Sequence, residues 1–183
     1  MTLTPSQAQA SLDDIERVVR RVKQSAIYRN ASVLLILWGA IVAMGYVGCE
    51  VAPRYAAAVW LICQAGGLLA TIALSARFAR DEEYRVDIRV IGAVLLFFGF
   101  GLLWSQVFGH FGPRGLNAFW ATLFMFGYAV AGIWLGRAFV ILGLTVTALT
   151  VAGYLWVGPW FNLYMAVVDG GGLMLCGLWM RRA

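Results

Sequence analysis

The stretch WFNLYMAVVDGGGLMLCGLWM, residues 160–180, decides how the chain must fold, because it is long and apolar enough to cross a membrane. A carboxylate, Asp169, lies near its middle. A charged group at that depth costs at least about 2.5–3.5 kcal/mol, so it normally faces other helices or water and marks a functional position. The stretch therefore predicts a helix whose Asp169 face is turned inward, which requires further spans around it.

The composition predicts a polytopic membrane protein. The 183 residues are 62% hydrophobic and only 13% charged, whereas soluble domains carry about a quarter charged residues. The net charge of +5 comes from basic residues scattered between apolar segments and mixed with acids. This pattern favours an anionic lipid surface over nucleic acid as the partner. The three cysteines are widely spaced without a CxxC motif, so neither a disulfide framework nor a redox site is predicted.

Six apolar segments are each near the ~20 residues needed to cross the hydrocarbon layer. Connectors containing Pro53, Pro113 and Pro159 separate several of them and should stop the helices. We therefore expect an all-α bundle of six transmembrane helices over residues 31–183, preceded by a cytoplasmic amphipathic arm over residues 1–30. The predicted spans are Ala31–Gly48, Tyr55–Ala76, Val90–Gly109, Leu116–Gly136, Ala138–Val157 and Trp160–Met180.

The distribution of basic residues predicts the orientation. Twelve of the fourteen Lys and Arg residues fall in the arm, the second and fourth connectors and the tail, against Arg54 and Arg114 on the other side. The positive-inside rule then places both termini in the cytoplasm, and we expect a bacterial inner-membrane protein.

Two cytoplasmic segments are candidates for contact with a protein partner. Residues 11–28 begin with an approximate capping box, Ser11 and Asp14, and carry one apolar stripe, which fits either a helix lying on the inner leaflet or a partner-docking helix. Residues 77–89 carry opposite charges four residues apart, typical of helices that continue into the cytoplasm. A solvated charged elbow or a docking site would both fit this second segment.

Several polar residues are predicted near mid-membrane depth or on the Asp169 face. Asn162, Asp169 and Cys176 recur every seven residues, so they share one face of the last helix. Counting from the ends of the spans places Gln64 and Thr147 close to the level of Asp169. The candidate polar site is Asp169, Gln64, Thr147, Thr150 and Asn162.

Glycines gather at the same depth and predict close helix packing, because small residues let membrane helices approach one another. Gly132 and Gly136 also form a GxxxG pair. The glycines predicted to pack are Gly39, Gly66, Gly99, Gly132, Gly136, Gly170, Gly171 and Gly172.

Asp169 has two interpretations. No Lys or Arg lies in any span, so burial favours the neutral, hydrogen-bonded acid. A structural interhelical hydrogen bond is one interpretation, and such bonds average only about 0.6 kcal/mol in membranes. The other is a protonation or cation site in a transport path, helped by a Gly-Gly-Gly run that would unwind the helix locally.

Catalytic signatures are missing from the sequence. The one histidine, His110, falls in a connector, and no GxSxG, HExxH or Walker A motif occurs. Glu50 and His110 are both expected at the outer surface, where they are better explained as ordinary surface residues than as metal ligands. We therefore predict no enzyme activity, no cofactor and no metal site.

Two parts of the sequence resemble a family of small bacterial six-span membrane proteins of unestablished activity. They are the lead into the first span, IERVVRRVKQSAIYRNASVLLILWGAIVAMGY, and the end of the chain from Phe124, including AVVDGGGLMLCGLW. The family likewise has a glycine cluster in its last span, and its genes often neighbour winged-helix regulators. The resemblance implies a regulatory or envelope-stress role, while Asp169 departs from an apolar position in the family.

These observations leave two hypotheses about function. The first is a small regulatory or structural membrane protein that acts through packing and partner contact, without catalysis. The alternative is a proton- or cation-linked transporter or channel for a small solute that uses Asp169, as a homo-oligomer because six short helices enclose little volume.

Overall fold

The computed structural model describes residues 5–81 and 88–182, and the described residues are almost entirely helical, with no strand among them. Six helices in this part of the chain are long and apolar enough to cross a membrane, which confirms the predicted all-α bundle. The elements are α1 (Pro5–Val51), η1 (Pro53–Tyr55), α2 (Ala56–Asp81), α3 (Ile88–Leu103), η2 (Trp104–Phe108), α4 (Pro113–Leu135), α5 (Arg137–Trp156), η3 (Gly158–Trp160), α6 (Phe161–Met165), η4 (Ala166–Gly171) and α7 (Gly172–Met180). The last four form one span, Gly158–Met180.

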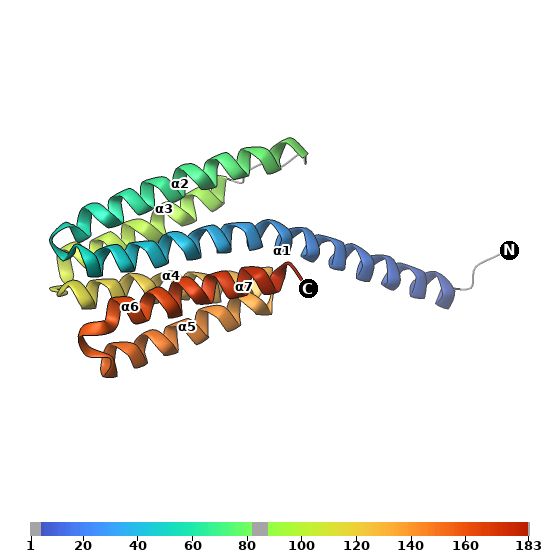
Figure 1. The fold of residues 1–183 in the computed structure, drawn as a ribbon. Coiled ribbons are helices and arrows are strands. Elements are labelled where there is room, and N and C mark those ends of the chain that lie inside the picture. The colour runs from blue at the N-terminus through green and yellow to red at the C-terminus, as the bar shows by residue number, and fades with distance from the viewer. Residues whose placement is uncertain (1–4, 82–87, 183) are drawn as a thin grey trace.

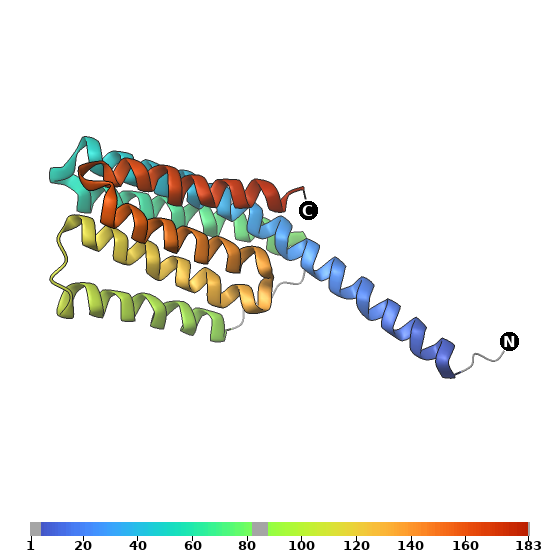
Figure 2. The same cartoon turned by 90° about the horizontal axis from the view of Figure 1, so that it is seen from below.

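Helix α1 is a single helix of 47 residues that contains both the predicted arm and the first span. It begins at Pro5, ahead of the expected start at Ser11, and no Gly or Pro interrupts residues 6–38. At 1.5 Å per residue it is about 70 Å long, more than twice the ~30 Å of a hydrocarbon layer. Its first half therefore projects well beyond the bundle, as Figures 1 and 2 show.

The second predicted partner segment, residues 77–89, is only partly described. Helix α2 continues to Asp81 and α3 begins at Ile88, as expected for helices that extend past the membrane. Residues 82–87 lie outside the described part, and they include Arg85, the opposite charge four residues after Asp81.

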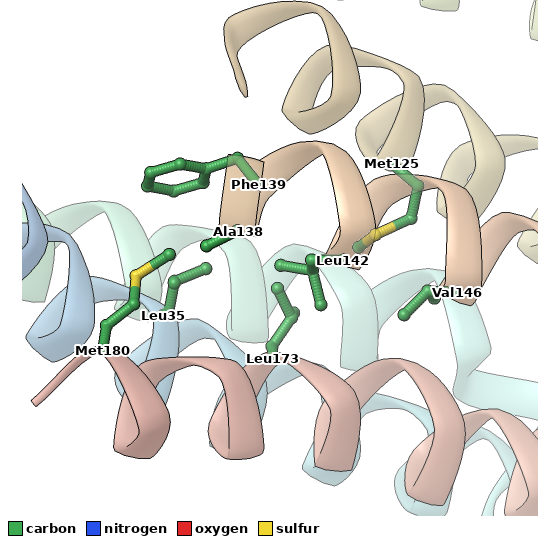
Figure 3. Packing of buried hydrophobic residues seen from close by; sticks show 8 residues of the cluster. All are labelled: Leu35, Met125, Ala138, Phe139, Leu142, Val146, Leu173 and Met180. Carbon is green, nitrogen blue, oxygen red and sulfur yellow. The ribbon is translucent and has the colours of Figure 1, made fainter. Parts of the chain in front are cut away.

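The core lies where α1, α4, α5 and α7 meet (Figure 3). Leu35 from α1 and Leu173 from α7 pack with Leu142 and Val146 of α5, and Met125 of α4 closes the cluster. A second buried cluster contains Tyr46, Ala121, Phe161, Met165 and Ala166. The two clusters join α1 to the last span along most of its length.

Helices α4 and α5 pack closely as an antiparallel hairpin, and the predicted GxxxG pair lies at their junction. A Cβ atom on Gly132 would come within 2.6 Å of the Val140 nitrogen, so only glycine fits there. Gly136 has φ of 133°, a conformation that L side chains rarely adopt, and it reverses the chain between the two helices. The pair therefore packs within one chain.

Helices α2 and α3 lie against the outside of this core. Helix α2 runs along α1, where the Trp38 Nε1 donates a hydrogen bond of 3.1 Å to the Thr71 hydroxyl. Helix α3 meets α4 through aromatic rings, such as Phe97 with Phe124 at 5.8 Å between centroids. Most of the apolar surface of both helices is exposed, which suits contact with a lipid bilayer.

Candidate functional site

Asp169 lies on η4 and is buried against α1, with only 4% of its surface exposed. The Tyr46 hydroxyl of α1 donates a hydrogen bond of 3.4 Å to its Oδ2 atom. The other oxygen, Oδ1, is buried without a hydrogen-bond partner among the described residues. A buried polar atom left unpaired is costly, so the inward-facing carboxyl group has only one of its oxygens satisfied.

The backbones of α1 and η4 approach closely enough for this contact because glycines face one another. A Cβ atom on Gly39 would lie 2.6 Å from the carbonyl oxygen of Gly170, and one on Gly170 would lie 2.7 Å from the Ala43 Cβ. Any side chain at either glycine would push the two backbones apart. Gly39 and Gly170 therefore hold Asp169 against α1.

The glycine run after Asp169 does not unwind the last span. The segment η4 is a turn of π-helix between α6 and α7, so the helix continues through the site with a wider turn. Such turns shift the backbone hydrogen bonds by one residue and are frequent at functional sites. The structure thus replaces the expected unwinding with a local widening that includes Asp169.

Only weakly acidic or neutral groups surround Asp169. Tyr128 of α4 and Cys176 of α7 pack against the buried cluster that begins beside it. Within the described ranges, no Lys, Arg or His forms an ion pair or a hydrogen bond with Asp169, which agrees with the absence of basic residues from the spans. An ionised Asp169 would have no cation to offset the loss of hydration.

The remaining polar residues predicted at this depth do not bond to Asp169. Thr150 is buried, and its hydroxyl donates to the Val146 carbonyl of the same helix at 2.8 Å. Gln64 and Thr147 are half-buried, and neither side chain hydrogen-bonds to another described residue. The structure instead supplies Tyr46 as the partner of Asp169, a residue outside the predicted polar site.

Asn162 lies near the end of the bundle that carries η1, residues 109–112 and η3, which we call the distal end (Figure 1). It accepts a hydrogen bond of 3.0 Å from Asn117 and donates one of 3.2 Å to the Glu50 carboxylate. Sequence reasoning missed both partners of Asn162. The available signal was that Glu50 follows Tyr46 by one helical turn, so the two residues share the face of α1 that contacts the last span.

Arg114 ties three elements together at the same end. Its guanidinium donates to the carbonyl oxygens of Gly153 and Tyr154 on α5, and it lies 5.0 Å from the Tyr154 ring and 5.2 Å from the Phe161 ring. Cation–π contacts of this kind contribute about 0.5–1 kcal/mol at exposed sites and more when desolvated. An open cleft of about 410 Å³ lies beside it, lined by Pro113, Arg114, Gly158, Pro159, Phe161 and Asn162.

The predicted packing glycines divide into two groups. Gly39, Gly132 and Gly170 lie in tight contacts. A Cβ atom added to Gly172 would lie 3.1 Å from the Val146 side chain, a less severe contact. Gly66, Gly99 and Gly171 have open space where a Cβ atom would sit. The close approaches therefore lie in the core, and the open glycines on α2 and α3 make no tight helix contact within the chain.

Comparison with protein-family models, with curated proteins and with solved structures found no match for this chain. No group of three or more His, Cys, Asp or Glu side chains that would hold a metal ion occurs among residues 5–81 and 88–182. Two groups of buried or half-buried polar contacts stand out in the described residues: the Asp169–Tyr46 pair, and the contacts of Asn162 and Arg114 at the distal end.

Proposed function

We propose that this chain is a small integral membrane protein of regulatory or structural type, without catalytic activity, that acts by holding a protein partner through its amino-terminal arm. The observation that carries this proposal is the continuity of α1, which runs from Pro5 through the membrane span to Val51. A helix packed into the core along one half presents its other half in a fixed direction. Residues 11–28 on that half would form the docking surface, with residues 77–89 as a second contact.

The orientation of the arm belongs to the same proposal. The sequence assigns twelve basic residues to the cytoplasmic side. Ten of them lie in the arm, in the tail, and in α2 or the connector that follows it. The other two lie at the start of α3 and at the start of α5. The positive-inside rule then supports a bacterial inner-membrane protein with both termini in the cytoplasm.

Crosslinking in the native membrane tests the proposal. Tagged full-length protein, a variant lacking residues 1–27, and an Asp169→Asn control that keeps the arm would be crosslinked and compared by quantitative mass spectrometry. We expect a defined partner that is enriched with the full-length and Asp169→Asn proteins and lost with the truncation. If the truncated protein inserts normally and keeps every partner and cellular phenotype, the arm does not carry the function.

A second candidate function, proton- or cation-linked transport of a small solute, is favoured by one observation. The Asp169 Oδ1 is buried without a partner near the middle of the last span, where it would serve as a binding atom. Flux into proteoliposomes that depends on a pH or cation gradient, and that disappears in Asp169→Asn, would support transport. Equal flux in protein-free vesicles would exclude it.

A further inference from the structure

Two polar contacts join α1 to the last span, one above the other. The outer contact links Glu50 to Asn162 at 3.2 Å, and the inner one links Tyr46 to Asp169 at 3.4 Å. Tyr46 and Glu50 are four residues apart on α1, and Asn162 and Asp169 are seven apart on the last span, so each pair shares a helix face. The contacts therefore form a ladder that runs from the distal end toward the middle of the membrane.

The outer contact is accessible from the distal surface. Asn162 lines the open cleft of about 410 Å³ beside Arg114, and both Asn162 and Glu50 are only partly buried. The Asn117 amide extends the same polar group onto α4. Water that enters the cleft thus reaches the outer contact.

One apolar layer separates the outer contact from the inner one. Met165, which is fully buried, packs with Phe161, Ala166 and the Tyr46 ring between the two levels. Four residues of α1 span about 6 Å along the helix axis, and seven residues of the last span cover about 10 Å, a gap that a short chain of two or three water molecules would bridge. Methionine is unbranched and adaptable, so this layer is suited to brief opening.

Toward the opposite end, Asp169 is covered more deeply. Leu173, Leu35, Phe139 and Met180 form a continuous buried cluster between η4 and the end of the bundle that carries the carboxyl terminus (Figure 3). Among the described residues, the titratable side chains that pack against this cluster are Tyr28, Tyr128 and Cys176, and neither Tyr128 nor Cys176 forms a side-chain hydrogen bond with another described residue. The shorter apolar barrier is therefore the distal one.

We infer that Asp169 is a proton-binding site that exchanges its proton with the distal surface through the Tyr46 and Glu50–Asn162 ladder. When the site is loaded, the proton is on Oδ1, and Oδ2 still accepts the Tyr46 hydrogen bond. On release, the O–H bond of Oδ1 breaks, the proton passes to water entering beside Met165, and the Glu50 carboxylate accepts it. Tyr46 positions the carboxyl group and remains neutral throughout.

A proton fits this site better than a metal ion. Among the described residues no second carboxylate contacts Asp169, and the close contacts of Gly39 and Gly170 leave little room for a hydrated cation. Hard cations require about six oxygen ligands. The inference deepens the second candidate function, because a transporter would need this site, but proton exchange at Asp169 does not itself require transport.

Hydrogen–deuterium exchange of the carboxyl group, followed by infrared spectroscopy of full-length protein in lipid vesicles, tests this inference. The band of protonated Asp169 is assigned by its loss in Asp169→Asn, and its shift is timed after transfer to D₂O. We expect Glu50→Gln and Asn162→Leu to slow the exchange at least about tenfold, equivalent to 1.4 kcal/mol in the barrier. Tyr164→Phe, which removes a hydroxyl bonded instead to the Leu149 carbonyl, should leave the rate unchanged.

Two results would overturn the inference, and a third would separate it from transport. Slower exchange in Tyr128→Phe, with normal exchange in both ladder variants, would place the route on the opposite side. The absence of a protonated carboxyl band would remove the proton site itself. Normal ladder-dependent exchange without gradient-driven flux would keep this inference and reject transport. Glu50→Gln preserves side-chain size, so it remains informative if Asn162→Leu fails to fold.

Discussion

The span formed by α5 and the span formed by α2 are almost equally apolar, yet the structure uses them differently. Their mean hydropathies are 2.0 and 1.9, while 39% of the α5 span is buried against only 6% of the α2 span. The first span and the last span are also 39% buried, and that of α3 is 11% buried. Hydropathy therefore identifies the spans but not the helices that form the core, and glycines lie opposite another backbone where α1 meets the last span and where α4 meets α5.

The largest expected difference in stability is between adding one methyl group in the core and adding one on the flanking helix α2. Gly39→Ala would place its Cβ 2.6 Å from the Gly170 carbonyl oxygen, and such overpacking costs about 1–3 kcal/mol. Gly66→Ala would meet open space and should be neutral, or stabilising by up to about 1 kcal/mol through helix propensity. The free energy of unfolding in detergent or bicelles measures both. Equal losses in the two variants would erase the distinction between core and flank.

A smaller difference is expected between two arginines at the distal end. Arg114→Gln loses two ring contacts and the carbonyl contacts that join α4 to α5, and it should lower the free energy of unfolding by about 1 kcal/mol. Arg54→Gln changes an exposed side chain on η1 and should have little effect. Comparing the thermal unfolding of the two variants would show whether the Arg114 contacts stabilise the packing of α4 on α5. A larger loss of stability in Arg54→Gln would contradict this role for Arg114.

The Tyr46–Asp169 hydrogen bond should contribute less than either packing or Arg114. A double-mutant cycle with Tyr46→Phe and Asp169→Asn isolates the pair, and we expect a coupling of about 0.6 kcal/mol, the average for membrane hydrogen bonds. Tyr164→Phe serves as the matched loss of a hydroxyl outside the pair. A coupling several times larger would mean that the site is a principal source of stability, rather than a weakly held group available for proton exchange.

The smallest effect is expected for Gln64 on α2. Its side chain is half-buried and makes no hydrogen bond within the described part of the chain, so Gln64→Leu should leave the melting temperature nearly unchanged. A clear loss of stability would reveal a polar contact from α2 to the core or to a second copy of the chain.

The number and type of spans are predictable from the sequence, because a run of about 20 apolar residues has few alternatives to a membrane helix. The inward direction of Asp169 is predictable for a similar reason, since its exposure to lipid would be costly. The continuity of α1 is harder to predict, because polar and apolar halves on either side of residue 30 suggest two segments. The absence of Gly and Pro from residues 6–38 is the signal that favours one helix.

The partner of Asp169 was not predictable from span positions alone. Tyr46 lies near one end of its apolar segment and Asp169 near the middle of another, so counting from span ends places them at different depths. The long tyrosine side chain and the wide turn of η4 bring their oxygens to 3.4 Å. Gln64 and Thr147 are predicted at the same depth as Asp169 but do not make this contact, because depth alone does not fix which helices are neighbours.

The core can hold the arm in a fixed direction only if α1 is unbroken. The distance between two spin labels on α1 tests this continuity most directly. Labels at Gln9→Cys and Met44→Cys, both exposed positions, would be placed on a chain whose native Cys49, Cys63 and Cys176 are replaced. A continuous helix predicts one narrow distribution near about 52 Å, from 35 residues at 1.5 Å each. A broad or much shorter distribution, with a control pair at Met44 and Leu175 remaining narrow, would contradict a rigid arm.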